Sequence, residues 1–145
     1  MLFFKKKEPA QPKTNYYNVA GLSYYLDNLR SVGTERPKFK LSDDQLVKKV
    51  TGKRAYKYGF PEEPVQLIPE PTNPHDKNAI QIILAGALIG YVPSDKCAEV
   101  RMIMQKHTIQ KITVFISGGE HKLVENGKVT LIDEPYQGEL RIYYV

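Results

Sequence analysis

The sequence has few of the residues that usually carry metal or redox chemistry. Among 145 residues it has one cysteine, three histidines and no tryptophan. A single cysteine excludes both a disulfide framework and a Cys-x-x-Cys pair, so we expect Cys97 to pack in the core. His107 and His121 lie 14 residues apart, and neither has a second histidine or cysteine at ligand spacing. We therefore expect them at the surface or at a helix end, and we expect neither a metal nor a cofactor.

Catalytic motifs and long apolar runs are missing as well. There is no P-loop, no Gly-x-Gly-x-x-Gly and no Gly-x-Ser-x-Gly, and the acidic pairs Glu62-Glu63 and Asp133-Glu134 adjoin prolines in expected turns. We therefore expect a protein that is not an enzyme. No apolar stretch approaches membrane-spanning length, and the four residues at the start are followed at once by lysines, unlike a secretory signal. These features predict a cytoplasmic protein.

Positive charge is concentrated in the first part of the chain. The net charge is +5, but residues 1–60 hold 13 Lys/Arg against 5 Asp/Glu, while residues 61–145 hold 8 against 11. Such a distribution suits a partner that carries phosphates. The lysine run at positions 5–7 belongs to a segment, residues 1–17, without helical or strand periodicity. We expect this segment to be a flexible basic arm.

Two helical regions are expected. Between a capping Asn18 and a terminating Gly33, apolar residues at helical spacing predict an amphipathic helix; they are Val19, Leu22, Tyr25, Leu26 and Leu29. Ser42 and Gln45 match a capping box and predict a short helical turn, so residues 18–47 form a helical extension. A second helix begins at residues 93–95 and ends near His107.

Short strand-like runs fill the rest of the chain. They are rich in β-branched and aromatic residues and occupy positions 50–58, 65–68, 79–84, 87–92, 112–116, 122–124, 129–132 and 139–144. Gly118-Gly119 would bend the chain, and Asn126-Gly127 is typical of a tight hairpin. A sheet of about six short strands with so few helices is best closed into a small barrel, so we expect a mainly β (α+β) fold. Its core would be a small OB-like barrel of about six strands over residues 48–145, with an inserted helix and the N-terminal amphipathic helix.

A polar loop between two strands is the most informative segment. Residues 73–80 read Asn-Pro-His-Asp-Lys-Asn-Ala-Ile, and Pro74 favours an extended Asn73. Asp76 and Asn78 can accept hydrogen bonds from nearby backbone amides, which would make the loop rigid. The residues leave two roles open, because these side chains could brace the loop or bind a ligand. His75 could equally be an ordinary exposed loop residue.

The same segment resembles the HIRAN domain. The resemblance rests on residues 73–80, on the Val-Gln-Leu-Ile-x-Glu run that precedes them, on Leu-Ile-Gly-Tyr-Val-Pro at 88–93, on Val-Thr-Gly-Lys-Arg at 50–54 and on Gly118-Gly119, so it covers about residues 48–145. HIRAN domains are modified OB-like barrels, found alone in bacteria and phages or fused to helicases and nucleases. In fork-remodelling helicases they bind the 3′-hydroxyl end of single-stranded DNA. The resemblance thus implies a non-catalytic, end-binding module in DNA repair, replication or phage-related processing, with a helicase or nuclease as a partner.

The resemblance also implies a set of site residues. Arg54 matches the basic residue of the first strand, Tyr91 matches the ring after the Ile-Gly pair, and three residues match the pocket loop: Asn73, His75 and Asp76. The sequence departs from the pattern at Ala55, where end-binding members have a stacking aromatic, at His75 in place of a frequent tyrosine, and at Ser94 in place of a basic residue.

Physical chemistry gives these residues specific roles in binding a single strand. Lys53, Arg54 and Tyr56 lie close together on one predicted strand, where cations could neutralise phosphates and a ring could stack on a base. The alternative to this binding role is that Tyr56 is half-buried in the barrel and the neighbouring lysines form an ordinary solvated face. An ionised Asp76 would accept a hydrogen bond from a 3′-hydroxyl and repel a 3′-phosphate. The whole nucleic-acid hypothesis, including this mechanism, requires the Asp76 loop and the Arg54 strand to converge on one solvent-accessible, cation-lined hollow.

A rival function is a protein–protein adaptor without nucleic-acid binding. The N-terminal helix would present Leu22, Leu26 and Leu29 on a stripe that could dock a partner. Packing of that stripe on the chain's own barrel is the competing explanation.

Overall fold

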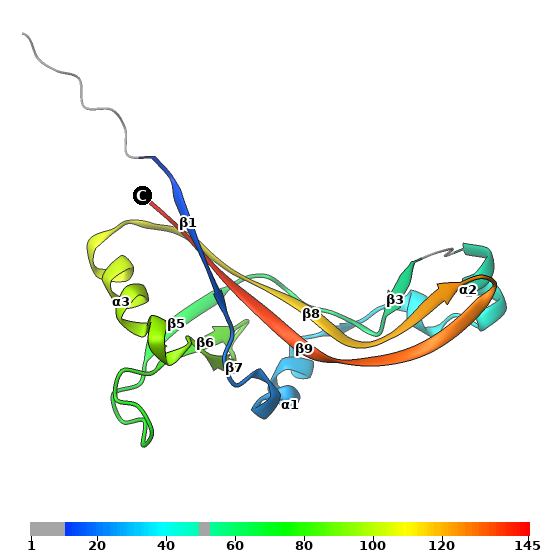
Figure 1. Cartoon of the computed structure of the whole chain (residues 1–145), viewed down its shortest axis with the longest axis horizontal. Helices are drawn as coiled ribbons and strands as arrows, with labels where there is room; N and C mark the ends of the chain where they lie inside the picture. Colours follow the sequence, from blue (N-terminus) through cyan, green and yellow to red (C-terminus); the bar gives the residue numbers. More distant parts are fainter. Residues whose placement is uncertain (1–10, 50–52) are drawn as a thin grey trace, which may run out of the picture.

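A computed structural model describes residues 11–49 and 53–145 and shows a mainly β chain drawn out along one long hairpin (Figure 1). The strands are β1 (Lys13–Asn18), β2 (Thr34–Glu35), β3 (Arg54–Tyr56), β4 (Tyr58–Gly59), β5 (Val65–Pro69), β6 (Ile80–Leu84), β7 (Ala87–Tyr91), β8 (Ile109–Glu125) and β9 (Lys128–Tyr144). The α-helices are α1 (Leu26–Ser31), α2 (Asp43–Lys49) and α3 (Cys97–Lys106), and 3-10 turns occupy η1 (Leu22–Tyr24), η2 (Pro37–Lys40) and η3 (Ser94–Lys96).

The hairpin β8–β9 replaces four of the expected strands with two strands of 17 residues each. Its turn has positive φ angles at Asn126 (50°) and Gly127 (72°), as the Asn-Gly pair predicts. Gly118 and Gly119 also have positive φ angles, and the register with β9 shifts between Ser117 and Gly119. This bulge bends β8 without ending it, because an extra residue leaves the ladder on both sides intact. The sequence therefore indicated the bend correctly but not the continuity of the strands.

No closed barrel is present among the described residues, so the prediction of an OB-like barrel was wrong in this respect. The strands form three sheets: β1-β9-β8-β3, β2-β4 and β5-β6-β7. A single isolated bridge, Ala20 to Tyr91, connects the three-stranded sheet to the segment after β1. The barrel cannot close because half of the long hairpin extends beyond the core and pairs with β3 there (Figure 1).

The main hydrophobic core lies at one end of the molecule. It is formed by β5–β7, by α3 and by the inner face of the β1-β9-β8 sheet, with Ile80, Ile82, Ile89, Val100, Leu140 and Ile142 fully buried. Cys97 is 1% exposed, so it packs in the core as expected, and burial raises the pKa of its thiol. The predicted inserted helix is confirmed as η3 and α3, and His107 caps the end of α3 as expected.

The N-terminal segment differs from the prediction in two places. Residues 13–17, expected in a flexible arm, belong to β1, which pairs with the end of β9. The predicted amphipathic helix from Asn18 to Gly33 is wrong as a single helix. Asn18 ends β1, Gly21 has a φ of 74°, which a right-handed helix cannot accommodate, and only η1 and the six-residue α1 follow. Residues 11 and 12 precede β1 outside any element, and residues 1–10 of the expected arm lie outside the described residues.

The far end of the hairpin carries a second, small core. Leu46 of α2 packs there with Ala55 and Val124. The capping box is confirmed, because the Ser42 amide donates to Gln45 Oε1 (3.1 Å) and the Gln45 amide donates to Ser42 Oγ (3.3 Å). In the described ranges, no helix is both long and apolar enough to span a membrane.

Candidate nucleic-acid interface

A groove of about 730 Å³ lies between η2, β3, β4 and the middle of β8. Three cationic side chains contribute to its walls, namely Arg36, Lys38 and Arg54, against one carboxylate, Glu62. No ion pair of Arg36 or Lys38 occurs within residues 11–49 and 53–145. Aromatic rings complete the lining: Tyr56, Tyr58, Phe60 and Phe115. The groove therefore combines positive charge with stackable rings, which is the combination that binds single strands.

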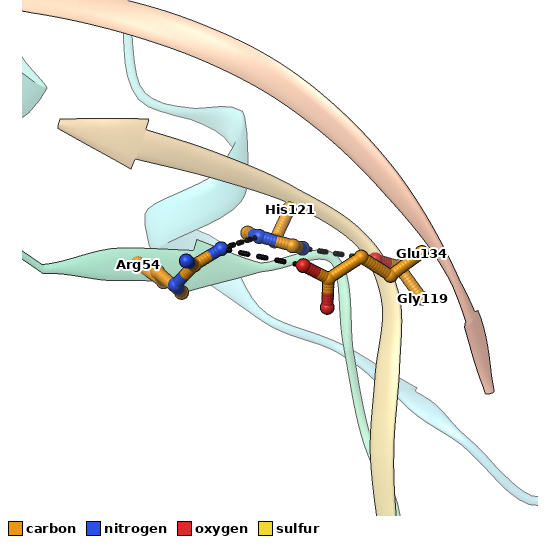
Figure 2. Close-up of polar contacts among 4 residues, drawn as sticks. All are labelled: Arg54, Gly119, His121 and Glu134. Atoms are coloured by element: carbon orange, nitrogen blue, oxygen red, sulfur yellow. Dashed lines mark hydrogen bonds and ion pairs between the residues drawn. The ribbon is translucent and has the colours of Figure 1, made fainter. Parts of the chain in front are cut away.

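Arg54 is held in the groove wall by a buried histidine. Figure 2 shows its Nη1 atom directed at Nε2 of His121, with Glu134 Oε1 3.6 Å from the same nitrogen. A guanidinium can only donate hydrogen bonds, so Nε2 of His121 must be the acceptor. Nδ1 then carries the proton and donates to the Gly119 carbonyl oxygen at 2.9 Å. This chain of contacts fixes both the tautomer of His121 and the direction of Arg54.

His121 was expected at the surface, and that expectation was wrong, because its side chain is 0% exposed. The reason is the long hairpin, which places His121 opposite Tyr56 on the covered side of β8. The two rings lie 4.7 Å apart at 33°. The His121 ring thus forms hydrogen bonds with Arg54 and Gly119 through its two nitrogens and packs against the Tyr56 ring. No group of histidine, cysteine and carboxylate side chains in the described part of the chain could hold a metal ion.

The polar loop between β5 and β6 forms a separate cluster around Glu70. Oε1 of Glu70 accepts from Asn73 Nδ2 (3.1 Å), and Oε2 accepts from the Tyr91 hydroxyl (2.9 Å) and from Gln81. Oδ1 of Asn73 in turn accepts the amides of His75 (2.9 Å) and Asp76 (3.0 Å). The pKa of Tyr91 is raised to about 12, mainly by burial and further by side-chain hydrogen bonds with Tyr25 and Glu70. Asn73 and Tyr91 therefore brace the loop.

Two loop residues remain accessible to a ligand. Asp76 uses Oδ1 to accept the Asn78 amide (2.9 Å), while Oδ2 has no hydrogen-bond partner within the described ranges. The His75 side chain is exposed, and its ring has no polar partner there either. Arg101 of α3 fixes the loop from the other side through Asn78 Oδ1 (3.2 Å) and the Asn78 carbonyl oxygen (3.3 Å).

The structure does not bring all the predicted site residues together. Arg54 and Tyr56 line the groove, and Lys53, directly before β3, is exposed but is not part of the lining. No residue of the 70–79 loop, nor Tyr91, lines the groove. Figure 1 shows the loop beside α3 at one end of the molecule and β3 toward the other end of the hairpin. The expectation of one hollow shared by Asp76 and Arg54 was therefore wrong.

Several groove residues were missed by the sequence interpretation. Arg36 and Lys38 flank a proline within the basic N-terminal part of the chain, and that charge was the signal that could have identified them. Phe115 looked like an ordinary strand residue, but it is 46% exposed. The side-by-side placement of η2, β3 and β8 is a tertiary contact that no local pattern predicts.

Replacing Asn73 with alanine is expected to destabilise the fold by about 1–3 kcal/mol, because one side chain makes three hydrogen bonds in the loop. Asn78→Ala is the matched control, since among the described residues its side-chain oxygen accepts only from Arg101, in an exposed contact. Urea unfolding of both variants measures the difference. Equal losses would show that Asn73 is not the brace described here.

Comparison with known proteins identifies the family. A family model of the HIRAN domain matches residues 13–131. The chain therefore belongs to the HIRAN domain family, whose members are generally modules that bind single-stranded DNA and its 3′ ends. The match begins at β1 and includes α1 and α2, so it extends further toward the N-terminus than the resemblance seen in the sequence. Comparisons with curated proteins and with solved structures gave no significant match.

Proposed function

We propose that this protein is a non-catalytic module that binds single-stranded DNA through the groove between η2, β3 and β8. The observation that carries the proposal is the composition of the groove, whose lining includes three cations, four aromatic rings and one carboxylate. Phosphates would contact Arg36, Lys38 and Arg54, and bases would stack on the rings at about 1–3 kcal/mol per base. We place this activity in DNA repair, replication or phage-related DNA processing, alongside a helicase or nuclease.

Arg54 is suited to a phosphate because its contacts leave donors available. His121 and Glu134 both contact Nη1, whereas Nη2 and Nε have no partner among the described residues. These two nitrogens form one side of the guanidinium fork, which can bind a phosphate through two parallel hydrogen bonds. His121 would thus position Arg54 without contacting the nucleic acid.

Recognition of a 3′ end would occur at the loop, separately from the groove. The free Oδ2 of Asp76 could accept a hydrogen bond from a terminal 3′-hydroxyl, and the negative charge would repel a 3′-phosphate. The exposed His75 ring could stack on the last base. Because groove and loop lie apart, strand binding and end selection should respond independently to mutation.

Fluorescence anisotropy with labelled oligonucleotides tests both parts. We expect salt-sensitive binding of single strands, weak binding of blunt duplex, and tighter binding of a 3′-hydroxyl than of a 3′-phosphate strand. Asp76→Asn should remove the difference between the two ends while leaving strand binding intact. Equal affinity of the wild type for both ends would overturn end selection, and no binding at low salt would overturn the whole proposal.

The adaptor alternative loses the feature on which it rested. Leu22 and Leu29 are 5% and 0% exposed, respectively, and both belong to the main core. Leu26, the third residue of the stripe, is half-buried. Two of its three leucines are thus used in the chain's own packing, which supports the DNA-binding proposal over the adaptor.

A further inference from the structure

The outer face of the β1-β9-β8 sheet carries two exposed aromatic rings with a guanidinium between them. Tyr16 of β1 is 61% exposed and Phe115 of β8 is 46% exposed. The Cζ atom of Arg141, on the strand between them, lies 5.9 Å from the centre of the Tyr16 ring and 5.5 Å from that of Phe115. Arg141 is held in place by Glu139, whose Oε1 accepts from its Nε at 2.7 Å.

The sheet register explains why these side chains share one face. Tyr16 pairs with Arg141, and Phe115 pairs with Glu139, two residues away on the same strand. Alternate residues, such as Tyr17 and Leu140, point into the core. With strands about 5 Å apart and about 3.3 Å of rise per residue, the two aromatic positions are roughly 12 Å apart across the sheet. That spacing corresponds to a few nucleotides of a single strand.

The face is continuous with the groove, because Phe115 contributes to both. It lines the groove wall and also contacts the Arg141 guanidinium. A strand that leaves the groove over Phe115 would therefore meet Arg141 and then Tyr16. We propose that single-stranded DNA bound in the groove continues across this sheet face and stacks a base on Tyr16. This proposal rests on the proposed function and gives the path that the bound strand would follow beyond the groove.

The composition of the face favours nucleic acid over a protein partner. The other large apolar side chains that are exposed in the described part of the chain, apart from Tyr24 of η1, are Ile68, Met102 and Leu131, and they lie on β5, α3 and the far half of β9. Tyrosine, phenylalanine and arginine also occur in protein interfaces, but carboxylates are depleted from interface centres, whereas here Glu139 lies opposite Phe115 and binds Arg141. Aromatic rings beside arginine suit bases, whose flat faces stack without regard to sequence.

Charge on this face is balanced, in contrast to the groove. Glu139 pairs with Arg141, and Glu63 pairs with Lys111 at 3.7 Å. Few counterions would therefore be released here, so stacking rather than phosphate attraction would provide the affinity. The two regions thus differ in salt dependence: changes in the groove should alter the salt slope of binding, and changes at Tyr16 should not.

The test compares dT oligonucleotides of about 5 and about 15 nucleotides binding to the whole chain. Tyr16→Ser should weaken binding of the longer strand about tenfold, without changing its salt slope, and should leave the shorter strand unaffected. Tyr24→Ser is the matched control, because Tyr24 is 86% exposed on η1, which is not part of the β1-β9-β8-β3 sheet. Unchanged affinity of Tyr16→Ser for the longer strand, with binding of the shorter strand intact, would overturn this inference and leave the groove proposal standing.

A spectroscopic readout reports stacking directly. The chain has no tryptophan, so Tyr16→Trp introduces a single tryptophan, which can be excited selectively over the tyrosines. We expect its emission to be quenched by the longer strand and not by the shorter one, whereas Tyr24→Trp should respond to neither. If Tyr16→Ser instead changes the sedimentation of the free protein, the face joins two copies of the chain and the inference is wrong. If neither strand binds the wild type, both proposals fail together.

Discussion

Replacing Arg36 and Lys38 by glutamine is expected to weaken single-stranded DNA binding by about 10- to 100-fold at low salt. Both side chains line the groove, and neither pairs with a carboxylate in the part of the chain that the structure describes. Each cation that contacts a phosphate contributes about 0.7 to the slope of log affinity against log salt for a single strand. Loss of two such contacts should therefore reduce the slope by about 1.4.

The control for this double variant removes the same charge elsewhere. Lys106 at the end of α3 and Lys128 at the hairpin turn are both exposed, and neither lines the groove. Lys106→Gln combined with Lys128→Gln should leave the affinity and the salt slope nearly unchanged. An equal loss from both double variants would mean that net charge, and not the groove, attracts DNA.

Replacing Gly118 with alanine is expected to destabilise the fold by about 4 kcal/mol. The residue has a φ of 86°, and an added Cβ would lie 2.2 Å from the Pro135 carbonyl oxygen across the hairpin. The backbone must shift to relieve this overlap, in addition to the strain of about 1–2 kcal/mol for a non-glycine residue in the left-handed region. Since Gly118 also lines the groove, DNA binding should weaken as well.

Gly86→Ala separates the two causes of that loss. Gly86 has nearly the same φ, 88°, but no atom lies within 4 Å of an added Cβ. We expect this variant to lose only about 1 kcal/mol in urea unfolding, the cost of the backbone conformation alone. If both variants lose the same amount, the close approach at the hairpin bulge is not what requires glycine at position 118.

Local patterns predicted the elements better than their assembly. The capping box at Ser42, the α3 helix and the Asn126-Gly127 turn all have short-range causes, namely a side chain bonding a nearby amide, a helical apolar period and a positive φ. The length of β8 and β9 could not be predicted in the same way, because Gly118-Gly119 marks both a strand end and a bulge. Which of the two forms depends on β9 continuing the ladder on both sides.

The candidate site also divides into local contacts that the sequence could predict and contacts between distant segments that it could not. Asp76 accepts a nearby backbone amide as the sequence predicted. The second predicted acceptor, Asn78, instead accepts from the Arg101 side chain, and Asn73 takes its place by accepting the amides of His75 and Asp76. The resemblance to the HIRAN domain grouped Arg54 with the polar loop in one site, whereas in the structure the two lie apart along the elongated hairpin. The groove depends on η2 lying near β3 and on His121 lying beneath Arg54, and both are contacts between distant segments.

Backbone amide chemical shifts recorded during titration with a single-stranded oligonucleotide test the central claim most directly. The groove account predicts that the largest shifts occur at Arg36, Tyr56 and Phe115, with smaller changes at the loop near Asp76. Shifts confined to residues 70–79, with none around the groove, would contradict it.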